Sequence, residues 1–401
     1  MNVAARVREI YEKHPYPASL GAPAANGPGQ PVPMEWINAV SPPRWPSPRR
    51  ILVAGCGTGQ EAIFLRRRFP KADVVAVDFS ARSIAAAREA QEASQPARPI
   101  RFLVADLTSR RFPEITGGDF DFVSCHGVLS YVPRPGDALR NLVLCIAPEG
   151  ALYLGVNGAE HFSVRARQFL PVFGFDMAEL PDDRRLGEVL ELRDAILGSG
   201  ASLASQAAGY LAGDLFGPLI HNLSLAEWIA FARAAGLHFS GSYSAFRSIR
   251  PALNSGLYRL LMPRSRAEVC EILETLAPSA FHPLVFRRRP LINPPWEAPD
   301  RLLDWRPALT GLYLRRFPGR RGSWNGLCDL KVKSPSTNTL MELCAREWEL
   351  EILRQSNGIR SLRKILEQVS IRVPRESLCR RIYRFYQAIL INLLPPASRT
   401  S

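Results

Sequence analysis

Long hydrophobic runs are missing from this sequence of 401 residues. A membrane-spanning helix needs about 20 mostly apolar residues, and the most apolar stretch near the C-terminus, residues 389–394, is far shorter. The first residues, Met1–Arg8, contain neither the apolar core of a secretory signal nor a cleavage site for one. We therefore expect a cytoplasmic protein that does not associate with a membrane.

Cysteine pairs and other metal or nucleophile motifs are also missing. The seven cysteines are scattered and include no Cys-x-x-Cys pair, which argues against a disulfide framework or a zinc knuckle and suggests a reducing compartment. His161, His221, His238 and His282 are isolated in the sequence and lack the spacing of metal ligands, so we expect no metal site. A Gly-x-Ser-x-Gly elbow and a P-loop lysine are absent as well.

Lysine is scarce, because only five of the 51 basic residues are lysines, and the net charge of +14 therefore comes from arginine. Together with abundant alanine, glycine and proline, this composition favours a GC-rich coding bias over a dedicated binding surface. The segment Arg354–Arg384 carries nine basic residues interleaved with aromatic ones. Nucleic-acid binding by this segment stays open, although the solvated face of a regulatory or dimerising helix bundle is favoured.

Strand and helix patterns alternate from residue 51 onwards. The expected strands are 51–54, 73–78, 100–106, 120–124, 151–156 and 237–243. A seventh strand at 281–286 should be antiparallel and lie at an edge, which would suit Pro283. Strands separated by helices in this way predict an α/β fold with a Rossmann-like, doubly wound and mostly parallel sheet of seven strands.

The remaining segments divide the chain into three expected parts. Residues 1–48 would be an N-terminal helix, at 2–13, followed by a wrapping or lid segment that includes the apolar stretch 34–40. Residues 49–290 would be the main domain, with a helical insertion at 161–222 above the carboxyl ends of the strands.

The third part, residues 291–401, would be a C-terminal accessory module that follows a proline-rich linker at 290–306. The patterns in this module predict strands and helices in that order along the chain. The expected strands are 309–314 and 327–332, and the expected helices are 339–354, 362–369 and 376–393. Such a composition is typical of a small α+β or winged-helix-like module, which could also join two copies of the chain.

The stretch Ile51–Glu61 organises the rest of the main domain. An apolar strand leads into three glycines at alternate positions, Gly55, Gly57 and Gly59, and a helix follows directly. A dinucleotide fingerprint would need a small residue where Gln60 stands. The spacing Gly-x-Gly-x-Gly instead suits a smaller nucleoside that carries a charged amino-acid tail.

Two aspartates end the next two expected strands. Asp78 is placed to accept both hydroxyls of a ribose, and Asp106 to accept the exocyclic amine of an adenine, with the amide of Leu107 available to a ring nitrogen. Either aspartate alone could equally cap a helix or lie in a solvated loop. The glycine loop, Asp78 and Asp106 all follow or end successive strands at their carboxyl ends, which favours a single binding site.

Residues 53–59, 77–80 and 105–107 resemble, in order and spacing, the first three motifs of the class I S-adenosylmethionine-dependent methyltransferases. The resemblance implies S-adenosylmethionine as the cofactor, bound by the glycine loop, Asp78 and Asp106. It further implies a methyl acceptor that is a protein side chain or a small molecule, with an RNA base as a third option. The cofactor-binding residues expected are Tyr11, Tyr16, Gly55, Cys56, Gly57, Thr58, Gly59, Asp78, Phe79, Asp106, Leu107 and His126.

Two segments narrow the resemblance further. Residues 7–17 and 125–133 are similar to segments of the bacterial protein-lysine methyltransferase-like group that carries a methyltransferase regulatory region. Of the Ser-Tyr-Asn motif that follows the fifth strand in that group, only Asn157 is present here.

Methyl transfer is an in-line displacement, so it depends mainly on alignment and exclusion of water. His126, Tyr131 and Asn157 follow the fourth and fifth strands and are the expected catalytic residues. His126 could be a general base or a loop residue whose backbone alone meets the cofactor. Tyr131 could line the acceptor pocket or belong to the core. Tyr11 and Tyr16 could close over the sulfonium as a lid or simply pack the N-terminal helix.

A function without turnover also remains open. The chain could be a non-catalytic S-adenosylmethionine-binding regulator or scaffold that engages a partner through its C-terminal module.

Overall fold

The computed structural model divides the chain into two compact units that interleave along the sequence. The first unit comprises Met1–Gly27, Ser47–Phe239 and Pro278–Arg289, and the second comprises Pro28–Pro46, Ser240–Ala277 and Pro290–Ser401. The structure describes residues 3–17, 32, 34–40, 47–96, 98–177, 179, 182–197, 212–249, 253, 258–310, 313–316, 327–333, 340–369 and 373–396. The expected boundary near residue 290 coincides with one of the five places where the chain crosses between units.

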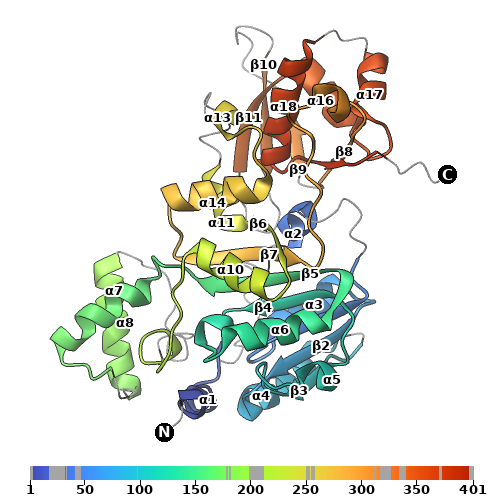
Figure 1. Cartoon of the computed structure of the whole chain (residues 1–401). Coiled ribbons are helices and arrows are strands. Elements are labelled where there is room, and N and C mark those ends of the chain that lie inside the picture. Colours follow the sequence, from blue (N-terminus) through green and yellow to red (C-terminus); the bar gives the residue numbers. More distant parts are fainter. Residues whose placement is uncertain are drawn as a thin grey trace. The chain divides into compact units, whose positions relative to one another are not determined.

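A seven-stranded sheet with the order β3-β2-β1-β4-β5-β7-β6 forms the frame of the first unit (Figure 1). The strands are β1 Arg50–Ala54, β2 Asp73–Asp78, β3 Arg101–Val104, β4 Phe120–His126, β5 Ile146–Asn157, β6 His238–Ser242 and β7 Phe281–Arg287. Strands β1 to β5 pair in parallel, and β7 pairs antiparallel with β5. The predicted α/β class and the mostly parallel seven-stranded sheet are therefore confirmed.

The position of β7 differs from the prediction. We expected an edge strand because of Pro283, but β7 lies between β5 and β6. Pro283 pairs with Gly155 in the antiparallel ladder, and the residues from Leu284 to Arg287 are buried. Its consecutive buried residues are typical of an interior strand. Its second neighbour, β6, ends almost forty residues earlier in the chain, and a single proline does not reveal that pairing.

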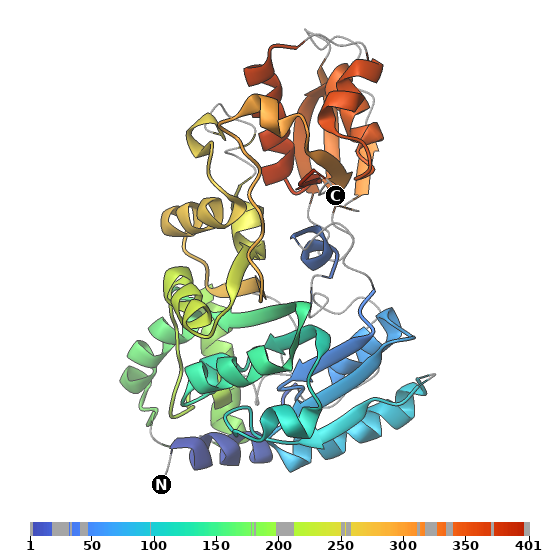
Figure 2. The ribbon, with the colours of Figure 1, turned by 45° about the vertical axis from the view of Figure 1, so that its right-hand side comes forward.

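Two groups of helices cover opposite faces of the sheet (Figure 2). One group consists of α1 Val3–Lys13, α3 Gln60–Arg68 and α4 Ala81–Ser94, and the other of α5 Phe112–Thr116, α6 Pro135–Cys145 and α10 Leu225–Ala234. Ser80 caps α4 by accepting from the amide of Ser83, and Ser224 with Glu227 forms a capping box on α10. These caps satisfy amides at the starts of the two helices that would otherwise lack partners.

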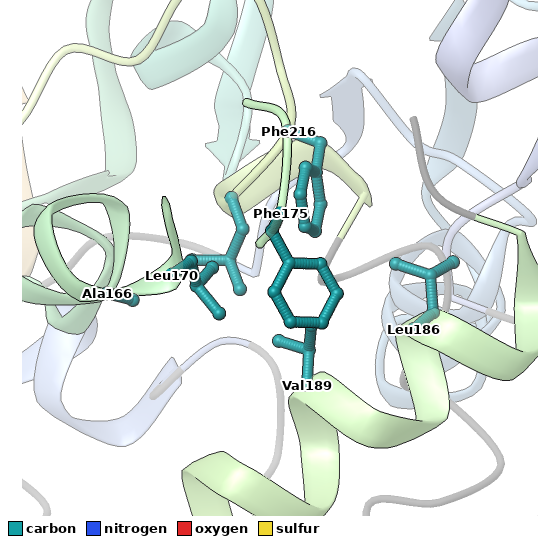
Figure 3. Close-up of a cluster of buried hydrophobic side chains, with 7 residues drawn as sticks. Ala166, Leu170, Phe175, Leu186, Val189 and Phe216 are labelled. Carbon is teal, nitrogen blue, oxygen red and sulfur yellow. The ribbon is translucent and has the colours of Figure 1, made fainter. Parts of the chain in front are cut away.

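The helical insertion contains α7 Phe162–Phe169, the 3-10 turn η2 Leu170–Phe173 and α8 Asp183–Leu197. These elements enclose a hydrophobic cluster of their own (Figure 3). Its buried members are Ala166, Leu170, Phe175, Leu186, Val189, Leu215 and Phe216. The part of the expected insertion at residues 198–211 lies outside the described residues.

Residues 34–40 belong to the second unit and are not the wrapping segment that we expected. They form α2, Met34–Val40, with the side chains of Met34, Trp36, Ile37 and Val40 buried. Trp36 meets Tyr243 edge to face in the same unit. The apolar face at helical spacing therefore makes this segment a core element. The other helices between the strands and the C-terminal part are α11 Tyr243–Ser248, α13 Tyr258–Leu261 and α14 Arg266–Leu276.

The C-terminal part is α+β, as expected, but several predicted boundaries are wrong. Its elements are α15 Pro299–Leu302, β8 Arg306–Leu309, β9 Tyr313–Arg316, β10 Leu327–Lys333, β11 Leu340–Arg346, α16 Glu347–Gln355, α17 Leu362–Val369, α18 Arg375–Gln387 and β12 Ile391–Leu394. The helix predicted from residue 339 begins at Glu347, because β11 first pairs with β10 over seven residues. The winged-helix likeness stays a prediction.

Two further segments were misjudged because their partners lie far away in the sequence. The helix predicted to reach residue 393 ends at Gln387, and β12 pairs with β8 instead. The predicted linker at 290–306 holds two buried tryptophans, Trp296 and Trp305, and Trp296 meets the ring of Tyr383 edge to face. Within the described residues, no helix is both long and apolar enough to cross a membrane.

Candidate functional site

The glycine loop joins the end of β1 to the start of α3. Gly55, Gly57 and Gly59 have φ angles of +80°, +51° and +85°, and Gly59 is the residue before the helix. These angles are in the left-handed region, which side chains disfavour, so the alternate glycines are required by the backbone path. Because the helix begins directly after the loop, its first amides face the loop and can bind an anionic group.

Asp78 ties the glycine loop to the next strand. Its Oδ2 accepts from the amide of Gly57 and its Oδ1 from the amide of Ser80, both at 2.9 Å. Burial raises the pKa of Asp78, and the amide donors, including those of Ser80 and Gly57, counteract that rise. The carboxylate therefore holds two loops at the carboxyl ends of adjacent strands in fixed positions.

The N-terminal segment, residues 12–17, lies against the same loops. The carbonyl of Tyr16 accepts from the amide of Thr58 at 3.2 Å, and that of Pro17 accepts from Thr58 Oγ1 at 2.8 Å. Glu12 accepts from the amides of Ala81 and Arg82 at 2.8 and 3.2 Å and so covers the start of α4. A Cβ at Gly57 would lie 2.0 Å from the carbonyl oxygen of Tyr16.

The groups expected to bind the base, Asp106 and the amide of Leu107, lie after β3. Asp106 accepts at Oδ1 from the amide and the hydroxyl of Thr108, at 2.8 and 2.7 Å. The carbonyl of Leu107 accepts from Asn141 Nδ2 at 2.7 Å, which orients that stretch of backbone. Because β2 and β3 are adjacent and parallel, Asp106 shares the edge of the sheet with Asp78.

An aromatic cluster continues this edge. The ring of Tyr11 meets Phe79 and Tyr131 edge to face, with centroids 6.0 and 6.4 Å away. Burial raises the pKa of Tyr11, and the negative charges of Asp214 and Asp78 raise it further. The structure thus brings Tyr11, Phe79 and Tyr131 together, while their roles beside the cofactor and the acceptor stay predictions.

A hydrogen-bonded network joins two of the three expected catalytic residues. The hydroxyl of Tyr131 donates to Asp214 and accepts from Asn157 Nδ2 at 3.2 Å. Burial raises the pKa of Tyr131 well above its ordinary value, with the charge of Asp214 as the next cause. The phenol is therefore neutral, and its proton is directed at the carboxylate.

His161 extends this network on the other side of Asp214. Its Nε2 lies 3.8 Å from Asp214 Oδ2, and its Nδ1 accepts from the amide of Ser163 at 3.4 Å. Burial lowers the pKa of His161 to about 4, so the ring is neutral at pH 7. A neutral ring that accepts at Nδ1 carries its proton on Nε2, where it faces the carboxylate.

His126 occupies a separate place. Its Nδ1 lies 3.7 Å from Glu61 Oε2, and its ring packs on Tyr153 and Phe281 with centroids 5.5 and 5.4 Å away. A Cβ at Gly155 would lie 2.5 Å from its Cδ2.

Sequence reasoning missed Glu12, Glu61, Asp214 and His161. His161 looked isolated because its partner lies more than fifty residues later, and Asp214 stands in a stretch without a motif. Glu61 offered the best signal, since it is the first acidic residue after the glycine loop. Among the residues that the structure describes, no group of three or more His, Cys, Asp or Glu side chains could hold a metal ion.

Part of this sheet is similar to known proteins. Residues 52–152 match a family described as a methyltransferase domain. The chain is similar to an uncharacterized protein of Synechococcus sp., with 31% identity over 46% of this chain and 44% of that protein. It is also similar to a demethylmenaquinone methyltransferase of Thermus thermophilus, with 37% identity over 26% of this chain and 46% of that enzyme. The chain thus spans less than half the length of these relatives.

Solved structures resemble the fold over most of the chain. The structure of PKMT2 from Rickettsia typhi has a TM-score of 0.54 and 14% identity, and the match covers 91% of this chain and 76% of that one. A structure of the same protein in complex with AdoHcy has a TM-score of 0.53 and 14% identity, over 93% and 77% of the two chains.

Proposed function

We propose that this chain, which carries a class I S-adenosylmethionine-dependent methyltransferase domain, transfers a methyl group in line to a nucleophile on a protein or small-molecule acceptor. The observation that carries the proposal is the joining of three loops at one edge of the sheet. The glycine loop, Asp78 and the N-terminal segment are hydrogen-bonded to one another, and Asp106 ends the adjacent strand.

The residues at this edge suit the cofactor. The positive-φ glycines leave the backbone open to a close approach, and the start of α3 offers amides to the carboxylate of the methionine end. Asp78 would accept from the ribose, and Asp106, with the amide of Leu107, from the adenine. Tyr11 and Phe79 would provide ring faces and edges beside the nucleoside.

On the acceptor side, we assign the catalytic network to Tyr131, Asn157 and Asp214. S-adenosylmethionine, when bound, supplies an electrophilic methyl carbon on a sulfonium. Asn157 and the hydroxyl of Tyr131 would orient the acceptor, and Asp214, whose Oδ2 lies 3.8 Å from Nε2 of His161, would take up the proton that the nucleophile loses. Burial of Asn157 and Asp214, each 2% exposed, keeps water from this network.

We do not assign His126 the role of general base, which was one of the two options suggested by the sequence. Its ring is packed against Tyr153, Phe281 and Glu61. This packing supports the other option, in which the backbone of the loop after β4 meets the cofactor.

The C-terminal basic run supports a protein or small-molecule acceptor over a nucleic acid. Most of its arginines are already engaged inside the second unit. The recorded pairs are Arg354 with Glu351, Arg363 with Asp304, Arg375 with Asp300, Arg380 with Glu376 and Arg381 with Glu349. Paired guanidinium groups release fewer counterions on binding to phosphates.

Calorimetric titration with S-adenosylmethionine, followed by an assay for S-adenosylhomocysteine with cell extract as the acceptor source, tests the proposal. We expect binding at micromolar ligand, a loss of about tenfold or more in affinity in Asp78→Asn, and formation of S-adenosylhomocysteine. Absence of binding at millimolar ligand would overturn the proposal. Binding without turnover would instead favour a regulatory or scaffold protein.

A further inference from the structure

Glu61 is a buried carboxylate that the proposed mechanism does not use. Strand β1 and the glycine loop contain no acidic residue, and Glu61 is the first one that follows them, in the first turn of α3. Its side chain is 12% exposed. A charged group in such a place needs a partner to offset the loss of hydration.

The carboxylate lies where the strand order of the sheet reverses. It interacts with Ser124, which pairs with Val53 across β1 and β4. Strand β1 has β2 on one side and β4 on the other, with later strands beyond β4. In open sheets of this kind, ligands bind outside the carboxyl ends of the strands at this reversal.

The two oxygens of Glu61 differ in their surroundings. Oε2 lies 3.7 Å from Nδ1 of His126, whereas Oε1 is buried and has no hydrogen-bond partner in the described part of the chain. Both oxygens of Asp78, the nearest carboxylate on the neighbouring strand, already accept from backbone amides. Each oxygen of Asp78 has thus taken one amide donor and keeps one acceptor position, whereas Oε1 of Glu61 has taken none.

The neighbours of Glu61 leave its charge uncompensated. Burial raises the pKa of each of Cys56, Cys125 and Tyr153, so these side chains stay neutral near pH 7. In the part of the chain that the structure describes, the ion pair recorded for Glu61 is the one with His126. Burial raises the pKa of Glu61 itself to about 7, as is typical of a carboxylate without a strong cationic partner.

We propose that Glu61 binds the α-ammonium group of S-adenosylmethionine through its unpaired carboxylate oxygen. This inference rests on the proposed function. The amides of the glycine loop suit the carboxylate of the methionine end, but a cationic ammonium group prefers an anionic acceptor, and the side chains of residues 55–59 include no carboxylate. A cation at Oε1 stabilises the ionised carboxylate, and the carboxylate in turn selects ligands that carry the amino-acid tail.

Two ligands that differ in this tail provide the test. S-adenosylhomocysteine carries the α-ammonium, and 5′-methylthioadenosine lacks the whole amino-acid part. We expect Glu61→Gln to weaken S-adenosylhomocysteine binding about tenfold to hundredfold and to leave 5′-methylthioadenosine binding unchanged. Glu89→Gln, which alters an exposed carboxylate on α4, should change neither. Retained binding of 5′-methylthioadenosine also shows that the variant is folded.

Proton release on binding gives a second readout. Near pH 7 the wild-type protein should release about half a proton when S-adenosylhomocysteine binds, measured by calorimetry in buffers of different ionisation enthalpy. Glu61→Gln should abolish this release. His126→Asn should retain it, which separates the carboxylate from the imidazole, since an imidazole can also titrate in this range.

The outcomes distinguish this inference from the function on which it rests. If neither ligand binds the wild-type protein, the proposed function fails. If S-adenosylhomocysteine binds equally well to Glu61→Gln, or if proton release disappears only in His126→Asn, the assignment of Glu61 is overturned and the function stands.

Discussion

At the scale of single residues, Glu61 makes the unliganded protein less stable than it could be. Its pKa rises from 4.5 to about 7 on folding, so the folded state favours the protonated form. The free energy of unfolding is therefore highest below pH 4.5 and decreases by about 3 kcal/mol in total as the pH rises to 7.

Glu61→Gln should remove this loss. We expect thermal melts of the variant to match the wild type near pH 5 and to exceed it by several degrees at pH 8, because Gln keeps the shape without the charge. Glu89→Gln should show no such pH-dependent difference. A variant that melts lower than the wild type at pH 8 would contradict the expected cost of burial.

Asp214 is the residue at which the acceptor network should be most sensitive. In Asp214→Asn the hydroxyl of Tyr131 no longer faces a carboxylate, and no base remains to take up the proton. We expect kcat to fall by about a hundredfold or more, with the affinity for S-adenosylmethionine changed by less than about threefold. Asp137→Asn, which alters a carboxylate on α6 that pairs with Arg134 and Arg140, is the control.

Equal losses in kcat and cofactor affinity in Asp214→Asn would show that this carboxylate holds the cofactor and not the acceptor network. Unchanged kcat would show that the acceptor reacts without losing a proton to this group.

Whether a site residue could be predicted depended on how local its partners are. Gly55, Gly57 and Asp78 belong to loops whose spacing follows from strand and helix lengths, so their positions were clear from the sequence. Asp214 and His161 meet only because the insertion folds back on itself. No sequence pattern within a few residues of either position indicates that contact.

At the scale of elements, the N-terminal segment and the glycine loop depend on each other. Gly57→Ala would place a Cβ 2.0 Å from the carbonyl oxygen of Tyr16, a backbone atom that cannot yield without moving the segment. We expect the variant to release residues 12–17 from the loop and to weaken cofactor binding. Limited proteolysis and hydrogen exchange at these residues measure the release.

Gly236→Ala is a matched control for backbone strain. Gly236 also has a positive φ, +87°, but a Cβ there meets nothing within 4 Å. Both variants should lose about 1–2 kcal/mol of stability from the left-handed backbone. Only Gly57→Ala should expose the N-terminal segment, and equal protease sensitivity in the two variants would count against a direct contact.

The elements themselves were predicted wherever their signals are local. Apolar periodicity located β2 and α1, because propensity and packing agree there. The interior position of β7, the strand β11 in place of a helix start and the pairing of β12 with β8 depend on which distant strand is available. A single sequence does not indicate which distant strands will pair.

At the scale of the whole molecule, the second unit is assembled from three separate parts of the chain. Arg266, which is 5% exposed, donates to Asn392 Oδ1 and to the carbonyl of Tyr386, at 3.0 and 2.7 Å, and its guanidinium lies 3.9 Å from the centroid of the Tyr386 ring. The hydroxyl of Tyr383 donates to the carbonyl of Leu261 at 2.7 Å. Residues 240–277 are thus held by the C-terminal part.

Removing residues 290–401 should therefore destabilise the parts of the second unit that precede them in the chain. The shortened protein would expose apolar side chains of α2 and would remove the hydrogen-bond partners and the ring that cover the Arg266 guanidinium. We expect binding of a hydrophobic dye and a lower melting temperature. Arg266→Met in the full chain should reproduce a smaller part of the loss. A shortened protein that melts like the full chain would show that the first unit is independent.

The interleaving of the two units also determines the order in which the protein can be completed on the ribosome. Helix α2 is among the first elements to emerge, yet it contacts β12, which is synthesised about 350 residues later. At about 5–20 residues per second, the apolar face of α2 waits roughly 20 to 70 seconds for that partner. Trp36 gains Tyr243 as a partner earlier, but the contact of α2 with β12 is missing until residues 391–394 have emerged. Part of the apolar face of α2 is therefore open to chaperones during that time, and slow codons before β12 would lengthen it.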